Sequence, residues 1–280
     1  TIYWVLLGAV FMTTCNNLED SIKAFEIYKQ AASRYGYVLY NPNDKYIGRS
    51  LDLYGEYSQG EVEIFRQIIK PGWTILDIGA NIGCHTVFMA QVTENSGRII
   101  AFEPQRQTFQ LLCANVILNS LFNVQCHNNA VSDSEGEILV PVLDPVSEQN
   151  FGGLDLRRQK QGETIKKITV DSLGLAACQF IKLDVEGMEI MALTGAQETI
   201  SKFRPIMYVE NDRKENSEAL IRLIASFGYR MYWHLPPLFN PDNYNKNPEN
   251  VFGNIVSENM LCFHRDNKIN ILGMSEVEVP

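Results

Sequence analysis

The sequence predicts an α/β fold built on a mainly parallel sheet with helices on both faces. From residue 73 onward, short apolar runs rich in β-branched residues alternate with longer segments of helical periodicity, a pattern typical of repeated strand and helix units. The chain has 280 residues, of which 45% are hydrophobic and 20% charged, so it has ample material for a core. These observations exclude a disordered, collagenous or multi-pass membrane chain.

Residues 1–57 are predicted to form an N-terminal extension. The apolar run Ile2–Met12 is shorter than the roughly 20 residues of a spanning helix and has no basic residue before it. We interpret it as a packed segment, with a truncated signal or anchor as the alternative. Apolar residues at helical spacing from Leu18 predict an amphipathic helix to about Tyr35, whereas the composition of residues 37–57 predicts short strands and turns.

A helix is predicted to begin after Ser58. Ser58 and Glu61 match the S-x-x-E capping box, in which the serine side chain accepts the N3 amide and the glutamate reaches back. Val62 and Phe65 continue the apolar spacing, and the helix should end before Pro71.

The remaining elements follow from the alternation of apolar runs and helical periods. Strands are expected at Thr74–Ile78, Ile99–Phe102, Val124–Cys126, Phe180–Leu183 and Ile206–Val209, with two more near Tyr229–Trp233 and Met260–Phe263. Helices are expected at Gly83–Gln91, Phe109–Asn119, Glu189–Thr194, Ala196–Lys202 and Glu218–Phe227. A hairpin or lid is expected to be inserted near 133–179, within a domain covering 58–265, and residues 266–280 form a tail.

The first motif that carries chemistry is T-I-L-D-I-G-A-N-I-G, from Thr74 to Gly83. Glycines are needed where the backbone turns tightly or approaches a ligand, and the following helix offers amide donors. Asn81 replaces the second glycine of the dinucleotide fingerprint, and the Gly-Lys-Ser/Thr of a P-loop is absent. A cofactor with adenosine but no phosphate fits this turn, and S-adenosylmethionine has that chemistry, with its cationic sulfonium near Asp77.

Two more strands deliver carboxylates to the same edge of the predicted sheet. Glu103 follows the strand next along the chain and can accept both hydroxyls of a ribose. Asp184 and Glu186 follow a third apolar strand, and ligands of such sheets bind at the carboxyl ends of strands. The structural alternatives are a cap of the following helix for Glu186 and an ion pair of Asp184 with Lys182 or Arg204.

Together these motifs resemble the FkbM family of S-adenosylmethionine-dependent methyltransferases, over roughly residues 46–262. The blocks that carry the resemblance are L-D-I-G-A-N-I-G, F-E-P, N-A-V and F-I-K-L-D-V-E-G, followed by Arg204-Pro205 and Glu210. The resemblance implies a class I methyltransferase fold, a Rossmann-like sheet of seven strands with the last antiparallel. It also implies transfer of a methyl group to a hydroxyl, often of a sugar or polyketide-like product.

The resemblance also implies roles for residues, by matching positions. The methionine half of the cofactor would be lined by Asp77, Gly79, Ala80, Asn81 and Gly83. Glu103 would hold its ribose, Asp184 would face the methyl group, and its adenine would be flanked by Asn129, Ala130 and Ser132.

The general base stays open at this level. Methyl transfer to an alcohol benefits from a group that accepts the hydroxyl proton, and the candidates are Asp184, Glu186, His85 and His234. The aromatic and asparagine-rich segment Tyr232–Phe252 suggests a saccharide acceptor. We prefer a mechanism without metal, although carboxylates in this region offer Mg²⁺ or Ca²⁺ a set of oxygen ligands. They are Asp184, Glu186, Glu210 and Asp212.

Charge and cysteine content limit the partners. The formal net charge is -9, so a nucleic-acid partner is not expected. The six cysteines form no C-x-x-C pair, which favours reduced thiols in a cytoplasm. Two other classes of function remain: an NAD-dependent sugar oxidoreductase or epimerase, and a non-catalytic nucleotide-binding module. The first needs the missing glycine, and the second predicts decayed motifs, whereas those here are intact.

Overall fold

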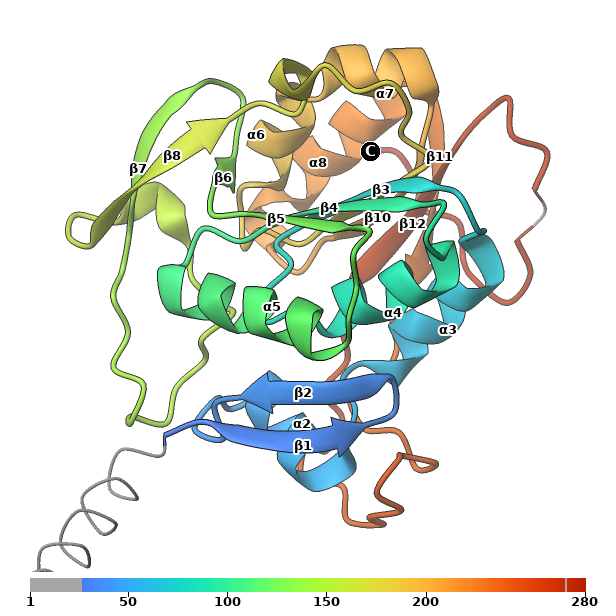
Figure 1. Cartoon of the computed structure of the whole chain (residues 1–280). Helices are drawn as coiled ribbons and strands as arrows, with labels where there is room; N and C mark the ends of the chain where they lie inside the picture. Colours follow the sequence, from blue (N-terminus) through green and yellow to red (C-terminus); the bar gives the residue numbers. More distant parts are fainter. Residues whose placement is uncertain (1–26, 270) are drawn as a thin grey trace, which may run out of the picture.

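The computed structural model describes residues 27–269 and 271–280, and within them a seven-stranded sheet forms the centre of the fold (Figure 1). The strands run in the order β5-β4-β3-β9-β10-β12-β11. Strand β12 runs antiparallel to both of its neighbours, β10 and β11, and the other pairs of this sheet are parallel. Their bounds are β3 Thr74–Ile78, β4 Arg98–Phe102, β5 Val124–His127, β9 Phe180–Leu183, β10 Ile206–Glu210, β11 Tyr229–His234 and β12 Asn259–His264. This topology confirms the predicted fold class.

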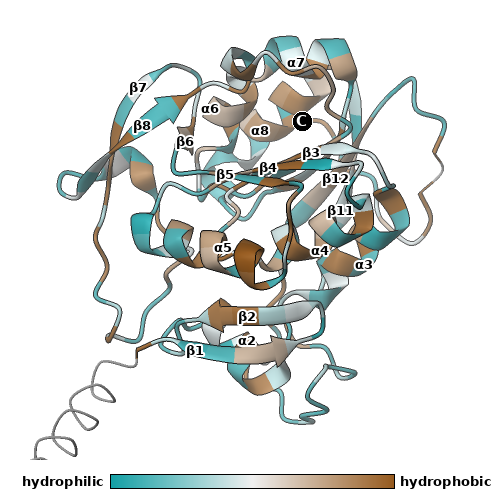
Figure 2. Ribbon diagram, viewed as in Figure 1, coloured by the Kyte–Doolittle hydropathy of each residue, from teal (hydrophilic) through white to brown (hydrophobic). Residues whose placement is uncertain are grey.

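Helices cover both faces of the sheet, and the helices of both layers contain hydrophobic residues (Figure 2). One layer contains α3 Gln59–Ile68, α4 Cys84–Thr93 and α5 Arg106–Leu118, and the other α6 Glu189–Thr194, α7 Gln197–Phe203 and α8 Lys214–Ser226. Successive strand residues point to opposite faces. Ile75 therefore packs with Phe65 of α3, whereas Leu76 belongs to the core shared with Ile224 of α8.

The segment in which an inserted hairpin or lid is expected contains an antiparallel pair of strands, and a third strand from just before it joins the pair. The three strands form a sheet in the order β6-β8-β7, made of Ala130–Val131, Glu163–Ile168 and Gly136–Val140. Two short 3₁₀ turns, Leu156–Arg158 and Asp171–Leu173, flank β8 in the chain. The insertion lies beside the carboxyl ends of β3 and β4, because residues of its loop contribute to a cavity there.

The N-terminal region differs from the prediction. The helix expected to about Tyr35 is wrong for the described part of that segment, where β1 Lys29–Ser33 pairs with β2 Gly36–Tyr40 in an antiparallel hairpin. The rest of the expected helix and the apolar run at 2–12 lie outside the described residues. The hairpin is fixed by α5, where Asn115 accepts a hydrogen bond from the Leu39 amide. The periodicity of the local sequence gives no indication of this tertiary contact.

A second difference is a helix that the sequence analysis did not predict. Residues Ile47–Tyr54 form α2, within the stretch for which turns were predicted. The helix is short and ends at Gly55, which has a φ of 66°. Its buried residues Leu51 and Tyr54 pack against two different clusters, so packing rather than propensity stabilises it.

Helix α3 begins after Ser58 as predicted, but the capping box does not form. Ser58 has a φ of 46° and makes no side-chain bond to the helix amides. Its hydroxyl instead donates to Oε1 of Glu61 at 2.8 Å. Both residues are buried, and Glu61 also accepts a hydrogen bond from Asn259. The pair therefore contributes to hydrogen bonding in the interior rather than to capping of the helix.

In the part of the chain that the structure describes, every helix falls short of the length and apolar character needed to cross a bilayer.

Candidate functional site

The register of the sheet brings four strand ends to one edge. Ile78 of β3 pairs with Phe102 of β4 and with Leu183 of β9. Leu183 in turn pairs with Val209 of β10. The residues that directly follow these four are Gly79, Glu103, Asp184 and Glu210. A neutral turn and three carboxylates therefore lie at the same level of the sheet, and two of these carboxylates, Glu103 and Asp184, are among those that the sequence placed at this edge.

The turn after β3 is built around Gly79. Its φ is 83°, and a Cβ at this position would lie 1.7 Å from the carbonyl oxygen of Asp184. The amides of Gly79 and Ala80 both donate to the carbonyl of Phe102, at 3.0 and 2.9 Å. Glycine is required here because the turn passes directly over the end of β9.

A buried ion pair lies beneath this turn. Asp77 and Lys182 are cross-strand partners, and Nζ of Lys182 lies 3.7 Å from Oδ1 of Asp77 and 3.2 Å from Oδ2 of Asp184. Burial alone would lower the pKa of Lys182, but the nearby carboxylates of Asp184, Asp77 and Glu61 outweigh it and raise that pKa. Thr86 donates to the other oxygen of Asp77 at 2.6 Å. Lys182 thus remains a cation that fixes the turn and the end of β9.

Glu103 forms the wall on the other side of the turn. Its two carboxylate oxygens accept the amides of Asn81 at 3.0 Å and Gln105 at 2.8 Å. Burial raises the pKa of Glu103 to about 7, against the lowering effect of these two amides. Each oxygen keeps a free lone pair for a ligand hydroxyl.

A first cavity opens beside Glu103 and has mainly apolar walls. Its apolar lining comes from Ile78, Phe102, Pro104, Ala130, Val131, Val140, Phe151, Leu154, Leu156, Val185 and Met188. Gly79, Asn81, Gln105, Asn129 and Gly152 also line it, together with the carboxylates of Glu103, Asp184 and Glu186. An apolar slot with a carboxylate at one end suits a base joined to a ribose.

A second cavity adjoins the first and is acidic. The two share Gly79, Asn81, Glu103, Gly152, Asp184 and Glu186. Among the described residues, six acids line the second cavity against the cations Lys182 and Arg213. The acids are Glu103, Asp184, Glu186, Glu210, Asp212 and Glu258. Asp184 lies at the junction of the apolar and the acidic cavity.

His85, on the first turn of α4, lines the second cavity. Its side chain is buried, and Oε2 of Glu61 lies 3.7 Å from its Nε2 atom. Within the described part of the chain, that atom has no hydrogen-bond partner. Burial first, and the charge of Lys182 second, lower the pKa of His85 to about 3. The ring is therefore a neutral acceptor near neutral pH, and a weak base.

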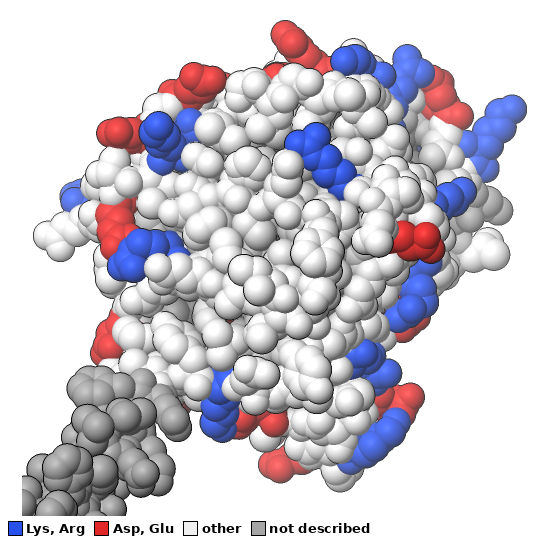
Figure 3. All heavy atoms as spheres, in the orientation of Figure 1, with Lys and Arg blue, Asp and Glu red and all other residues white. Residues whose placement is uncertain are grey.

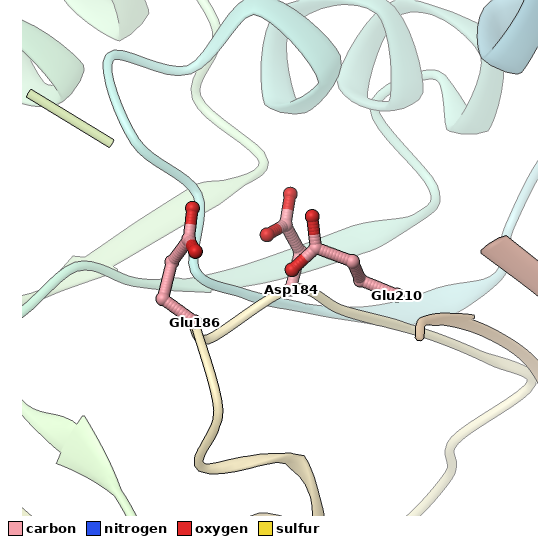
Figure 4. Close-up of side chains that lie close together, drawn as sticks. All are labelled: Asp184, Glu186 and Glu210. Carbon is pink, nitrogen blue, oxygen red and sulfur yellow. The ribbon is translucent and has the colours of Figure 1, made fainter. Parts of the chain in front are cut away.

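Three of the carboxylates converge (Figure 4). One ligand oxygen each of Asp184, Glu186 and Glu210 lies within 4.8 Å of the others. Glu186 is paired with Arg213, yet burial and then the charge of Asp184 raise its pKa to about 8. Burial and the neighbouring carboxylates also raise the pKa of Glu210 well above its usual value.

The structure separates four of the predicted site residues from both cavities. Asp77 lies beneath the turn, Ser132 is buried, and His234 bonds the Tyr208 hydroxyl at 2.7 Å. A Cβ on Gly83 would meet Leu112 of α5 at 2.7 Å, so this glycine serves helix packing rather than close approach to a ligand. Ala80 lines the second cavity rather than the first.

The aromatic and asparagine-rich segment also has a structural role. Of residues 232–252, only Leu238 lines either cavity. Phe239 packs against Tyr54 at 5.3 Å between ring centroids, and Asn240 donates to Glu56. This segment therefore gives no support to the saccharide acceptor that its composition suggested.

Several lining residues were not assigned from the sequence. The sequence suggests Lys182 only as an ion-pair partner of Asp184, a contact that the structure shows at 3.2 Å, although a lysine inside the apolar strand F-I-K-L already indicates a buried charge. Phe151 and Gly152 belong to the inserted lid, and Tyr57 and Arg213 come from distant segments. Their position depends on the tertiary fold, and no local signal marks them.

Comparison with known proteins identifies a family that is consistent with the motifs in the sequence. The family model described as the methyltransferase FkbM domain matches residues 77–231. A curated methyltransferase, sdnD of Sordaria araneosa, is 26% identical over 157 residues, which cover 44% of this chain and 60% of that protein. The chain thus spans less than two thirds of the length of this relative.

Two solved structures are also similar. A methyltransferase FkbM from Methylobacillus flagellatus is 20% identical, with a TM-score of 0.47 over 71% of this chain and 50% of that one. An S-adenosylmethionine-dependent O-methyltransferase from Thermotoga maritima is 12% identical, with a TM-score of 0.48 over 84% of this chain and 77% of that one.

Proposed function

The chain belongs to the FkbM methyltransferase family, whose cofactor is S-adenosylmethionine, and we propose that it methylates a hydroxyl group of a small acceptor. The observation that carries this proposal is the junction of the two cavities at Asp184. One cavity has mainly apolar walls with three carboxylates among its lining residues, whereas the other is acidic. A carboxylate that lines both cavities can take part in a reaction between a ligand in one cavity and a ligand in the other.

The residues present fit the cofactor. Bound S-adenosylmethionine supplies an activated methyl group on a sulfonium. Phe102, Pro104 and Phe151 offer apolar surface to an adenine, and Glu103 offers two free lone pairs to the ribose hydroxyls. The carboxylates of Asp184 and Glu186 on the same wall suit the positive charge of the sulfonium and amino groups.

Asp184 is the residue that we propose as the proton acceptor. Its side chain is partly exposed in both cavities, so it can reach an acceptor hydroxyl. Lys182 holds one of its oxygens in an ion pair and orients the carboxylate. His85 and Glu186 line the same cavity and are the alternative bases, whereas His234 does not line it.

The acidic cavity also bears on the acceptor. Six acids against two cations disfavour a polyanion there, and the face shown in Figure 3 carries Lys and Arg as separate groups rather than one basic patch. We therefore propose a small hydroxylated acceptor, and the exclusion of nucleic acid stays a prediction.

Glu103→Gln is expected to weaken binding of S-adenosylhomocysteine by about 1–3 kcal/mol, because it loses charge-assisted hydrogen bonds to the ribose. Isothermal titration calorimetry measures the change. Glu218→Gln is the control, since Glu218 is exposed and pairs only with Arg222 four residues on in α8. Equal affinity of wild type and Glu103→Gln would place the ribose elsewhere.

The same binding should depend on pH. The pKa of Glu103 is about 7 in the free protein. Hydrogen bonds from ribose favour the ionised carboxyl and lower that pKa in the complex. Affinity should therefore be constant above about pH 7 and should fall as the pH drops below it. The fall should vanish in Glu103→Gln; an identical pH profile in the two proteins would contradict this assignment.

Methyl transfer itself can be tested with labelled cofactor. The protein is incubated with S-adenosylmethionine carrying a deuterated methyl group and a panel of hydroxylated and amino acceptors. The proposal expects S-adenosylhomocysteine and a product whose label resides on oxygen, as identified by mass spectrometry and NMR. Label on nitrogen or carbon would retain the family but overturn the O-methyl assignment.

A further inference from the structure

We propose that Asp184, Glu186 and Glu210 form a binding site for a hard divalent cation, Ca²⁺ or Mg²⁺, at the floor of the acidic cavity. The ends of β9 and β10 place Asp184 and Glu210 side by side, because Leu183 and Val209 pair in register just before them. Glu186 reaches the same point from the turn after β9, where its φ is 54°. Figure 4 shows the three carboxyl groups directed to one side of the sheet edge.

Glu210 gives an observation independent of this clustering. Its Oε2 atom is shielded from solvent and has no hydrogen-bond partner among the described residues. A buried carboxylate oxygen without a partner costs free energy. Lys182 contacts Asp184 and Arg213 contacts Glu186, so the other two carboxylates each have a cationic partner. A cation among the three oxygens would give Glu210 the partner that it lacks.

The charge balance points the same way. The six acids of the cavity carry up to six negative charges when ionised, against the two positive charges of Lys182 and Arg213. A divalent ion would offset half of this excess of four negative charges. Asp212, which the sequence offered as a fourth ligand, lies 3.3 Å from Nε of Arg213 and is outside the group of three.

The spacing defines the class of cation. Two ligands of one ion are at most twice the metal–oxygen distance apart, about 4.6–5.2 Å for Ca²⁺ and about 4.0–4.2 Å for Mg²⁺. The three oxygens lie within 4.8 Å of one another, so the larger Ca²⁺ requires less movement of the carboxylates than Mg²⁺ does. Ligands that are all oxygens disfavour softer metals.

The role of the cation rests on the proposed function, whereas its binding does not. Ca²⁺ takes about six to eight oxygen ligands, so three carboxylates leave positions for waters or for oxygens of the acceptor. This would favour acceptors that present two neighbouring oxygens. Loss of turnover in Asp184→Asn is expected with or without the cation, so chelation is the informative treatment.

Calorimetric titration tests the site directly. The full chain is freed of metal with EDTA, dialysed, and titrated separately with CaCl₂ and MgCl₂. We expect one bound ion per chain and at least about tenfold weaker binding in Glu210→Gln, the loss typical when a metal site is disturbed. Glu186→Gln provides a second removal of a ligand. The matched control is Glu258→Gln, which removes a charge from the same cavity outside the three ligands.

Thermal unfolding supplies a second readout. In EDTA, Glu210→Gln should unfold at the same temperature as wild type or a higher one, because it removes a buried carboxylate without a partner. The bound ion should raise the midpoint of wild type but not of the variant. The proposal is overturned if wild type binds neither ion at about 10 mM, well above the weaker protein calcium sites. Equal weakening in Glu258→Gln would also overturn it.

A titration with S-adenosylhomocysteine in EDTA keeps the two proposals apart. Cofactor binding without cation binding would overturn the cation site alone. Cation binding without cofactor binding would retain the site and contradict the proposed function.

Discussion

Replacement of Asp184 by asparagine is expected to lower methyl transfer by about 10²- to 10⁴-fold, the usual contribution of a general base. The amide keeps the shape of the side chain but cannot accept the hydroxyl proton. Affinity for S-adenosylhomocysteine should change by less than about threefold, because Glu103 and the apolar cavity remain. Steady-state assay with a hydroxylated acceptor and calorimetry measure the two effects separately.

The matched control for Asp184→Asn is Glu258→Gln. It removes one negative charge from the same cavity, so it reports the effect of charge alone. If Asp184→Asn lowers turnover only as much as this control, Asp184 has a structural role through Lys182. The base would then be sought at Glu186 or His85, which line the same cavity.

Gly79→Ala is expected to damage both cofactor binding and catalysis. The added Cβ would stand 1.7 Å from the carbonyl oxygen of Asp184, so the end of β9 has to move by more than about 1 Å. Displacements of that size cost about 10²-fold in rate. Affinity for S-adenosylhomocysteine should fall at least about tenfold, since the turn over β9 forms part of both cavities.

Gly174→Ala separates backbone strain from this steric clash. Gly174 also has a positive φ, 56°, but a Cβ there meets nothing within 4 Å. It should cost only about 1 kcal/mol of stability, the usual cost of a left-handed residue, with cofactor affinity unchanged. Circular dichroism and calorimetry on both variants give the comparison. Unchanged cofactor binding in a folded Gly79→Ala would contradict the site described above.

The central sheet could be predicted because buried parallel strands are continuous apolar runs. The periods around Thr74–Ile78 and Phe180–Leu183 gave these two strands with their observed bounds. The β1–β2 hairpin could not be predicted in this way. Asn115 of α5 and Asn119, just after that helix, accept hydrogen bonds from the backbone amides of Leu39 and Tyr37 in β2.

The site was predictable where it depends on strand ends alone. Gly79, Glu103 and Asp184 follow residues that pair in register, and in a parallel sheet this places them together. His234 is the last residue of β11, which is the outermost strand of the sheet and lies two strands beyond β10. The position of a strand in the sheet cannot be obtained from local sequence. Phe151 lies in a loop of the insertion, and the position of that loop beside the cavity depends on the tertiary fold.

Thermal-shift titration tests the central claim, that the Gly79–Glu103 edge binds S-adenosylmethionine, most directly. Wild-type protein is heated with S-adenosylmethionine, S-adenosylhomocysteine or NAD. A ligand at about 100 times its Kd adds about 2.7 kcal/mol of stability. That corresponds to a rise of several degrees in a chain of this size. We predict this rise with both S-adenosyl compounds and no rise with NAD. A rise with NAD, and none with S-adenosylhomocysteine, would contradict the account and favour an oxidoreductase.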